Sequence, residues 1–244
     1  MFPIKVDILN RLRTEILPLE GLGTKTQDPA MDLGLEFMAE AFPNGHIPLG
    51  AVHELISEGV EAAASTAGFT AALLSGLMKS RGPVVWTGHN HSLFPPALKV
   101  FDILPDQVIF INLLKEKDIL WVTQEALKCP SLSGVICEIP ELNFTNSRRF
   151  QLAVEQSKTT GFILRSNPRS LSPNSCIARW RIKPLASFAE HGLPGLGYPR
   201  WKLDLLKIRN GRPGSWEVEW IKGKFQQVSK SSSSLFLQSE RKTG

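Results

Sequence analysis

Between residues 50 and 165 the chain alternates short apolar runs with longer amphipathic ones, and this alternation restricts its fold more than any other feature. The short runs are rich in Val, Ile and Phe and lack polar alternation, which is typical of strands covered by helices on both faces. Strands are expected at 50–56, 83–87, 107–111, 133–139 and 160–165, and helices at 67–80, 94–101, 115–127 and 146–158. The sequence therefore predicts an α/β domain with a mainly parallel sheet and right-handed crossovers.

The pattern changes after residue 176, where apolar and polar residues alternate. In the run 176–183, Trp180 and its apolar neighbours fall on one face, and Arg179 and Arg181 fall on the other. The runs 200–209 and 215–221 are joined by an Asn-Gly-Arg-Pro-Gly turn, which is a strong hairpin signal. We expect antiparallel strands here that extend the parallel sheet.

The two ends of the chain differ from the middle. Residues 4–17 carry apolar positions at helical spacing, and a Gly-, Thr- and Pro-containing linker follows at 21–29. The last sixteen residues are rich in serine, which predicts disorder. The expected organisation is an N-terminal helix and linker at 1–28, an α/β domain at 29–228 that opens with a short helix at 33–41, and a disordered tail at 229–244.

Composition excludes several classes of protein. The chain has 244 residues, 42% of them hydrophobic, and no uncharged apolar run reaches the ~18 residues of a membrane span. Its three cysteines (Cys129, Cys137 and Cys176) are odd in number and widely spaced. They fit neither a disulfide framework nor a zinc site, and we expect a reducing cytoplasm, no bound metal and no membrane.

The stretch "STAGFTAALLSGL" (65–77) resembles the start of a phosphate-binding loop in outline only. It is expected to be a small-residue loop that ends at Gly68 and leads into a helix. A phosphate-binding loop places lysine after this glycine and another glycine five residues before it. Here those positions hold Phe69 and Ala63. Phe69 shares a helical stripe with Leu73, so we expect it in the core.

Three segments carry a family resemblance: "PRWKLDLLKIRNGRPGSWEVEW" (199–220), "IPLGAVHEL" (47–55) and "NSRRFQLAVE" (146–155). They resemble the ImuA family, RecA-related accessory proteins of bacterial translesion synthesis. The resemblance extends over residues 5–228 and implies a RecA-like core.

The resemblance also implies where a nucleotide site would lie. Gly68, Phe69 and Thr70 take the phosphate-loop positions, Glu138 takes that of the metal-linked acid, and Asn90 takes that of the catalytic glutamate. An amide is no general base, and Thr70 alone is a poor anchor for Mg²⁺, so we expect a vestigial site without ATP, cofactor or catalysis. His89 and His91 lack a third ligand and are interpreted as a polar loop.

Positive charge is concentrated late in the chain. From Arg165 to Arg212 there are ten basic and two acidic residues, so this stretch carries 10 − 2 = +8, against +5 for the whole chain. By resemblance, segment 166–175 corresponds to a DNA-contacting loop of RecA. The expected basic face comprises Arg148, Arg149, Arg165, Arg169, Arg179, Arg181, Arg200 and Lys202. Clustered cations suit DNA phosphates, an acidic partner surface or a merely solvated strand face, and the sequence leaves these open.

As a function, the resemblance implies a non-catalytic adaptor in SOS-induced error-prone repair, located in the cytoplasm at the nucleoid. The implied partners are an ImuB-type homologue of Y-family polymerases, an error-prone polymerase III alpha-type subunit, RecA and single-stranded DNA. Two alternatives stay open. One is a DNA-stimulated ATPase with a rearranged phosphate loop that uses Thr70 and Glu138 on Mg²⁺. The other is a cell-division inhibitor that resembles SulA.

Overall fold

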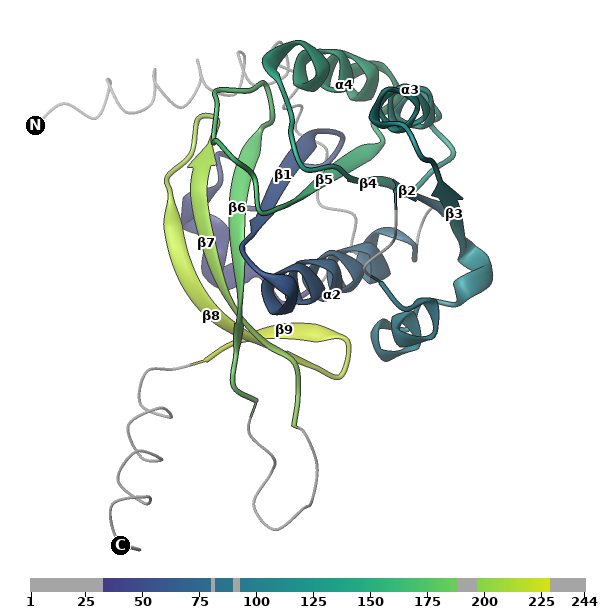
Figure 1. Ribbon diagram of the computed structural model, residues 1–244. Helices are drawn as coiled ribbons and strands as arrows, with labels where there is room; N and C mark the ends of the chain where they lie inside the picture. Colours follow the sequence, from purple (N-terminus) through teal and green to yellow (C-terminus); the bar gives the residue numbers. More distant parts are fainter. Residues whose placement is uncertain (1–32, 80–81, 90–92, 188–196, 229–244) are drawn as a thin grey trace, which may run out of the picture.

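In the computed structural model the described residues are 33–79, 82–89, 93–187 and 197–228, and their strands form one nine-stranded sheet (Figure 1). The strand order is β3-β2-β4-β5-β1-β6-β7-β8-β9. The predicted α/β fold, with a mainly parallel sheet and added antiparallel strands, is confirmed. The helix expected at 4–17 and the tail at 229–244 lie outside the described residues.

The parallel part of the sheet holds the strands that the apolar runs predict. They are β1 (Val52–Ser57), β2 (Val84–Gly88), β3 (Val108–Asn112), β4 (Gly134–Glu138) and β5 (Thr160–Ser166). All six residues of β1 are buried, because helices cover the parallel sheet on both faces and β1 has a neighbouring strand on each side.

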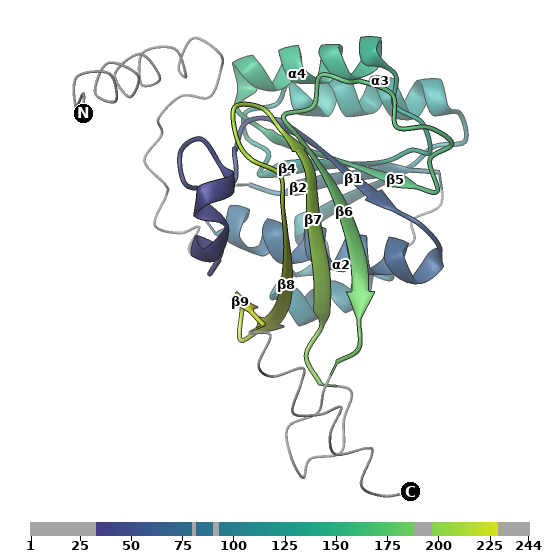
Figure 2. The same ribbon diagram turned by 90° about the vertical axis from the view of Figure 1, so that its left-hand side faces the viewer.

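Helices lie on both faces of the sheet (Figures 1 and 2). Helix α2 (Val60–Leu77) covers one face, and α3 (Glu116–Leu127) and α4 (Phe144–Ser157) cover the other. Helix α4 begins where the side chain of Asn143 accepts a hydrogen bond from the Asn146 N–H (2.8 Å), a standard N-cap. The short helices expected at 33–41 and 94–101 are 3₁₀ helices, η2 (Glu36–Ala41) and η3 (Pro95–Phe101), and a further 3₁₀ turn, η4 (Pro105–Gln107), precedes β3.

The C-terminal strands are β6 (Ala178–Leu185), β7 (Arg200–Ile208), β8 (Gly214–Ile221) and β9 (Lys224–Gln227). Strand β6 pairs with β1 in parallel, with His53 opposite Ala178, and with β7 in antiparallel orientation, so the antiparallel extension begins at the β6–β7 pairing. After β5, the loop 167–177 crosses β1. Strand β6 therefore lies on the other side of β1 and runs in the same direction as β1 and β5. Strands β7, β8 and β9 are antiparallel, as expected of the hairpin.

The turn of the β7–β8 hairpin packs on the end of η2. Arg212 donates its backbone N–H to the Ala41 carbonyl (2.9 Å). A Cβ on Gly211 would lie 2.3 Å from that same oxygen, so the contact requires glycine. The hairpin residues that the sequence singles out are therefore a tertiary contact as well as a turn.

The hydrophobic core forms two layers, one on each face of the sheet. In the layer under α2, Phe69 packs with Trp180, Trp201 and Phe225, at ring-centre distances of 6.4, 6.1 and 5.4 Å. The core position predicted for Phe69 is confirmed. Strands β6 to β9 curl around α2, which encloses this layer (Figure 1).

Helix α2 is 18 residues long and has a mean hydropathy of 1.2, so length and composition alone would let it cross a membrane. However, 61% of it is buried in the fold, as in the core helix of a globular domain.

Candidate functional site

The connection between β1 and α2 occupies the position where a phosphate loop would lie, and it is only two residues long. Strand β1 ends at Ser57, and α2 begins at Val60 after Glu58 and Gly59. Gly59 has a φ of +87°, a left-handed conformation that glycine adopts without strain. The expected loop ending at Gly68 is wrong, because the alanine-rich run after Val60 continues as helix.

The phosphate-loop candidates accordingly lie inside α2. Thr70 is buried and donates its hydroxyl hydrogen to the Thr66 carbonyl (2.8 Å). Gly68 faces Phe101 and Trp201, and Phe69 is in the core. None of these three residues lies at the start of the helix, where backbone N–H groups could receive a phosphate.

The Gly59 amide of this connection already has a partner. Gly59 donates its N–H to the side-chain oxygen of Asn167 (2.8 Å), and Asn167 donates its own N–H to the Ser57 carbonyl (2.8 Å). The β1–α2 connection is thus fastened to the loop after β5. An anion that approached Gly59 would compete with this amide oxygen.

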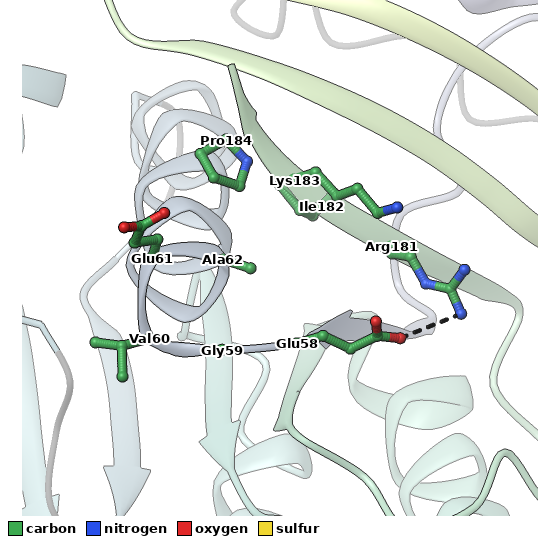
Figure 3. A pocket seen from close by; sticks show the side chains of 9 residues that line it. All are labelled: Glu58, Gly59, Val60, Glu61, Ala62, Arg181, Ile182, Lys183 and Pro184. Atoms are coloured by element: carbon green, nitrogen blue, oxygen red, sulfur yellow. Dashed lines mark ion pairs between the residues drawn. The ribbon is translucent and has the colours of Figure 1, made fainter. Parts of the chain in front are cut away.

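A hollow of about 460 Å³ lies beside the start of α2, between the helix and β6 (Figure 3). Its charged lining residues are Glu58, Glu61, Arg181 and Lys183, which balance two acids against two bases. Arg181 and Glu58 form an ion pair (3.5 Å), drawn as a dashed line in Figure 3. Because the lining is neutral in sum, this hollow lacks the excess of cations that a polyphosphate needs.

A second hollow, of about 230 Å³, lies at the carboxyl ends of the parallel strands, where open α/β sheets bind ligands. Its lining includes Thr66, His89 and Glu138. Glu138, the expected metal-linked acid, ends β4 and accepts a hydrogen bond from the Trp86 indole (2.5 Å). Asn90 and His91 lie outside the described residues, and the described part of the chain contains no cluster of three metal-ligating side chains.

A buried ionic cluster centres on Glu54, in the middle of β1. Its carboxylate is fully buried and accepts hydrogen bonds from Arg165 (2.5 Å), Arg179 (2.5 Å) and the side-chain amide of Asn174 (2.7 Å). Burial of a single charge is costly, so one acid in this position demands cationic partners. The sequence interpretation missed Glu54, although a charge inside the apolar run "AVHELI" was a signal of such a pair.

The two arginines of the cluster also hold the loop after β5. Arg165 bonds to Glu141 (2.7 Å) and to the Ser170 carbonyl (3.1 Å). Arg179 bonds to the carbonyls of Leu171 (3.3 Å) and Ser172 (2.6 Å). The side chain of Arg165 is 1% exposed and that of Arg179 is 11% exposed. The prediction that they lie on an exposed basic face is therefore wrong, because both guanidinium groups form ion pairs with the buried Glu54.

The other residues of the expected basic face differ in their exposure and pairing. Arg148 and Arg149 on α4 and Arg169 in the loop are exposed, although Arg148 lies 4.0 Å from Glu155. Arg181 is paired with Glu58, and Arg200 is buried, with a bond to the Ala186 carbonyl (3.3 Å).

Lys202 is half-buried opposite Glu217 on β8, and Arg200 lies opposite Glu219. These two acids come after residue 212, so a charge count that ends there misses them. The outer surface of β6 to β8 carries both signs of charge rather than one.

No family model matches the chain. It is 32% identical over 209 residues to Protein ImuA of Caulobacter vibrioides, strain NA1000 / CB15N, and equally to Protein ImuA of strain ATCC 19089 / CIP 103742 / CB 15. Each match covers 81% of this chain and 86% of the relative.

Proposed function

Because the chain belongs to the ImuA family, we propose that it is a non-catalytic, RecA-like adaptor in SOS-induced error-prone DNA repair. It links RecA and an ImuB-type homologue of Y-family polymerases to an error-prone polymerase III alpha-type subunit. It acts in the cytoplasm, at the nucleoid.

The observation that carries the non-catalytic part of the proposal is the β1–α2 connection. Two residues, Glu58 and Gly59, replace the longer loop that wraps phosphates, and the Gly59 N–H is bonded to Asn167. No lysine follows Gly68, and Glu138 is engaged by Trp86. These features support an ATPase core that has kept its sheet and lost its nucleotide chemistry.

The adaptor part of the proposal rests on the family and on the loop 167–177, which joins β5 to β6. Arg165 and Arg179, both paired with Glu54, bond to the backbone of this loop, which supports a preorganised surface for a partner. Of the expected basic face, Arg148, Arg149 and Arg169 are exposed and could contact an acidic partner or single-stranded DNA.

Two measurements test the two parts separately. In a pull-down, the purified chain should retain the ImuB-type homologue, and absence of association at micromolar concentrations would remove the adaptor. In isothermal titration, ATP with Mg²⁺ should give no heat of binding. Submillimolar ATP affinity, with turnover that is lost in Glu138→Gln, would instead favour a rearranged ATPase.

A further inference from the structure

Strand β3 ends the sheet and has one neighbour among the described residues, β2. Figure 1 shows it at the side of the sheet opposite β6 to β9. Edge strands are commonly blunted by lysine, proline or a bulge, since an open edge can pair with another chain. The sequence of β3, Val-Ile-Phe-Ile-Asn, contains no lysine or proline, and its register with β2 is continuous.

Exposed apolar side chains gather along this strand. Ile109 in β3 is 47% exposed, and Leu104 before it and Leu114 after it are 52% and 86% exposed. Val100, at the end of the adjoining η3, is 61% exposed. Four of the large exposed apolar residues thus fall within fifteen positions of the chain, in β3 and in the segments that lead into and out of it. We call these four residues and β3 the β3 edge.

We propose that two copies of this chain pair through the β3 edge, with their β3 strands antiparallel about a two-fold axis. Leu113 donates its N–H to the Gly88 carbonyl of β2 (3.0 Å). Backbone groups alternate in direction along a strand, so those of Val108 and Asn112 point to the open edge. An antiparallel partner strand would pair with them, and the sheets of the two copies would become continuous.

A second copy fits this edge because the edge is self-complementary. Ile111 packs on the α3 side of the sheet, and by alternation Ile109 faces the same side. A two-fold axis through the middle of β3 places Ile109 of one copy opposite Ile111 of the other, which joins four isoleucines. The axis also brings Asp106, in the η4 turn before the strand, near the segment that follows the partner's β3 and leads to Lys115, the N-cap of α3. Strand β3 contains no charged residue, so no like charges of the two copies would face each other across the axis.

Sedimentation velocity of the full chain over a range of micromolar concentrations tests the pairing. The wild-type mass should rise from 27.0 kDa toward twice that value. Ile109→Lys should stay monomeric, because it places two like charges against an apolar contact. Leu152→Lys is the matched control: Leu152 is 46% exposed on α4, away from β3, and this variant should associate like wild type.

A wild-type chain that stays monomeric throughout, or an Ile109→Lys variant that associates like wild type, would overturn the pairing. A mass that grows beyond two copies would also overturn it, since an isologous contact closes on itself. Hydrogen exchange on the wild-type chain needs no variant. Backbone amides within 108–112 should gain protection on concentration, and unchanged exchange there would count against the β3 edge.

Discussion

At the scale of single residues, Glu54 is the buried carboxylate with which both Arg165 and Arg179 form ion pairs. Replacing it by alanine leaves Arg165 and Arg179 without their shared carboxylate. Breaking a buried ion pair from one side typically costs about 3–5 kcal/mol. We expect Glu54→Ala to lower the free energy of unfolding by that amount in urea denaturation.

The control for this prediction is Glu61→Ala, at an exposed position on α2. It should change the free energy of unfolding by no more than about 0.5 kcal/mol. Equal effects of the two substitutions would mean that the ionic cluster is not needed for folding.

His53 gives the fold a pH dependence. Burial lowers the pKa of His53 from 6.5 to about 4. Its Nε2 donates to the Pro48 carbonyl (2.7 Å) and its Nδ1 accepts from the Trp180 indole (3.4 Å), so the ring is held neutral. Between these two pKa values the unfolded chain binds a proton that the folded chain does not. The contribution of His53 to the free energy of unfolding is therefore complete above pH 6.5, and it decreases as the pH falls toward about 4.

The expected loss across this interval is about 3 kcal/mol, from a pKa difference of about 2.5 at 1.36 kcal/mol per unit. Denaturant titrations at several pH values measure it. His53→Gln should remove this part of the pH dependence, while the part due to carboxylates remains. An unchanged profile in the variant would show that His53 is not its source.

At the scale of elements, the position of Gly68 inside α2 makes a testable difference. A Cβ at Gly68 would meet Phe101 and Trp201 at 3.5 Å, which are ordinary contacts. Alanine is favoured over glycine in a helix interior by up to about 1 kcal/mol. Gly68→Ala should therefore raise the free energy of unfolding by up to that amount.

Gly76 in the same helix is the matched control, because there a Cβ would lie 2.7 Å from the Leu33 side chain. Gly76→Ala should lower the free energy of unfolding, or raise it by much less than Gly68→Ala does. A Gly68→Ala variant that loses stability would indicate that residue 68 needs the conformational freedom of a loop.

At the scale of the whole molecule, the exposed arginines of the expected basic face lie on α4 (Arg148 and Arg149) and in the loop after β5 (Arg169). Binding of single-stranded DNA should be independent of sequence and should weaken steeply with salt, because counterions are released. Reversing Arg148 and Arg149 to glutamate should weaken it and lower the salt slope by roughly 0.7 for each phosphate that the variant no longer neutralises. ATP should have no effect. Fluorescence anisotropy at several salt concentrations provides the measurement.

Reversal of Arg179 is the informative comparison, since that residue holds Glu54 and two loop carbonyls. It should lower the free energy of unfolding rather than act on DNA alone. Absence of DNA binding at low salt would assign the exposed arginines to an acidic protein partner.

The sequence alone determined the features that depend on neighbouring residues. Apolar runs without alternation gave the parallel strands, and Asn-Gly-Arg-Pro-Gly gave the β7–β8 hairpin. Phe69 stands where a phosphate-binding loop has lysine. Its neighbours in the helical stripe are apolar, and this pattern predicted its position in the core. Each of these signals lies within a few positions of the residues that it describes.

The tertiary structure decided what depends on residues far apart in the chain. The order of the sheet makes β6 parallel to β1, and this pairing brings Arg179 to Glu54 across 125 positions. Arg165 meets the same carboxylate from β5, across 111 positions. A count of charges along the sequence cannot reveal such pairs, because strands that are distant in sequence become neighbours only when the sheet assembles. Because these paired charges are buried, they bind one another and are not available to a partner.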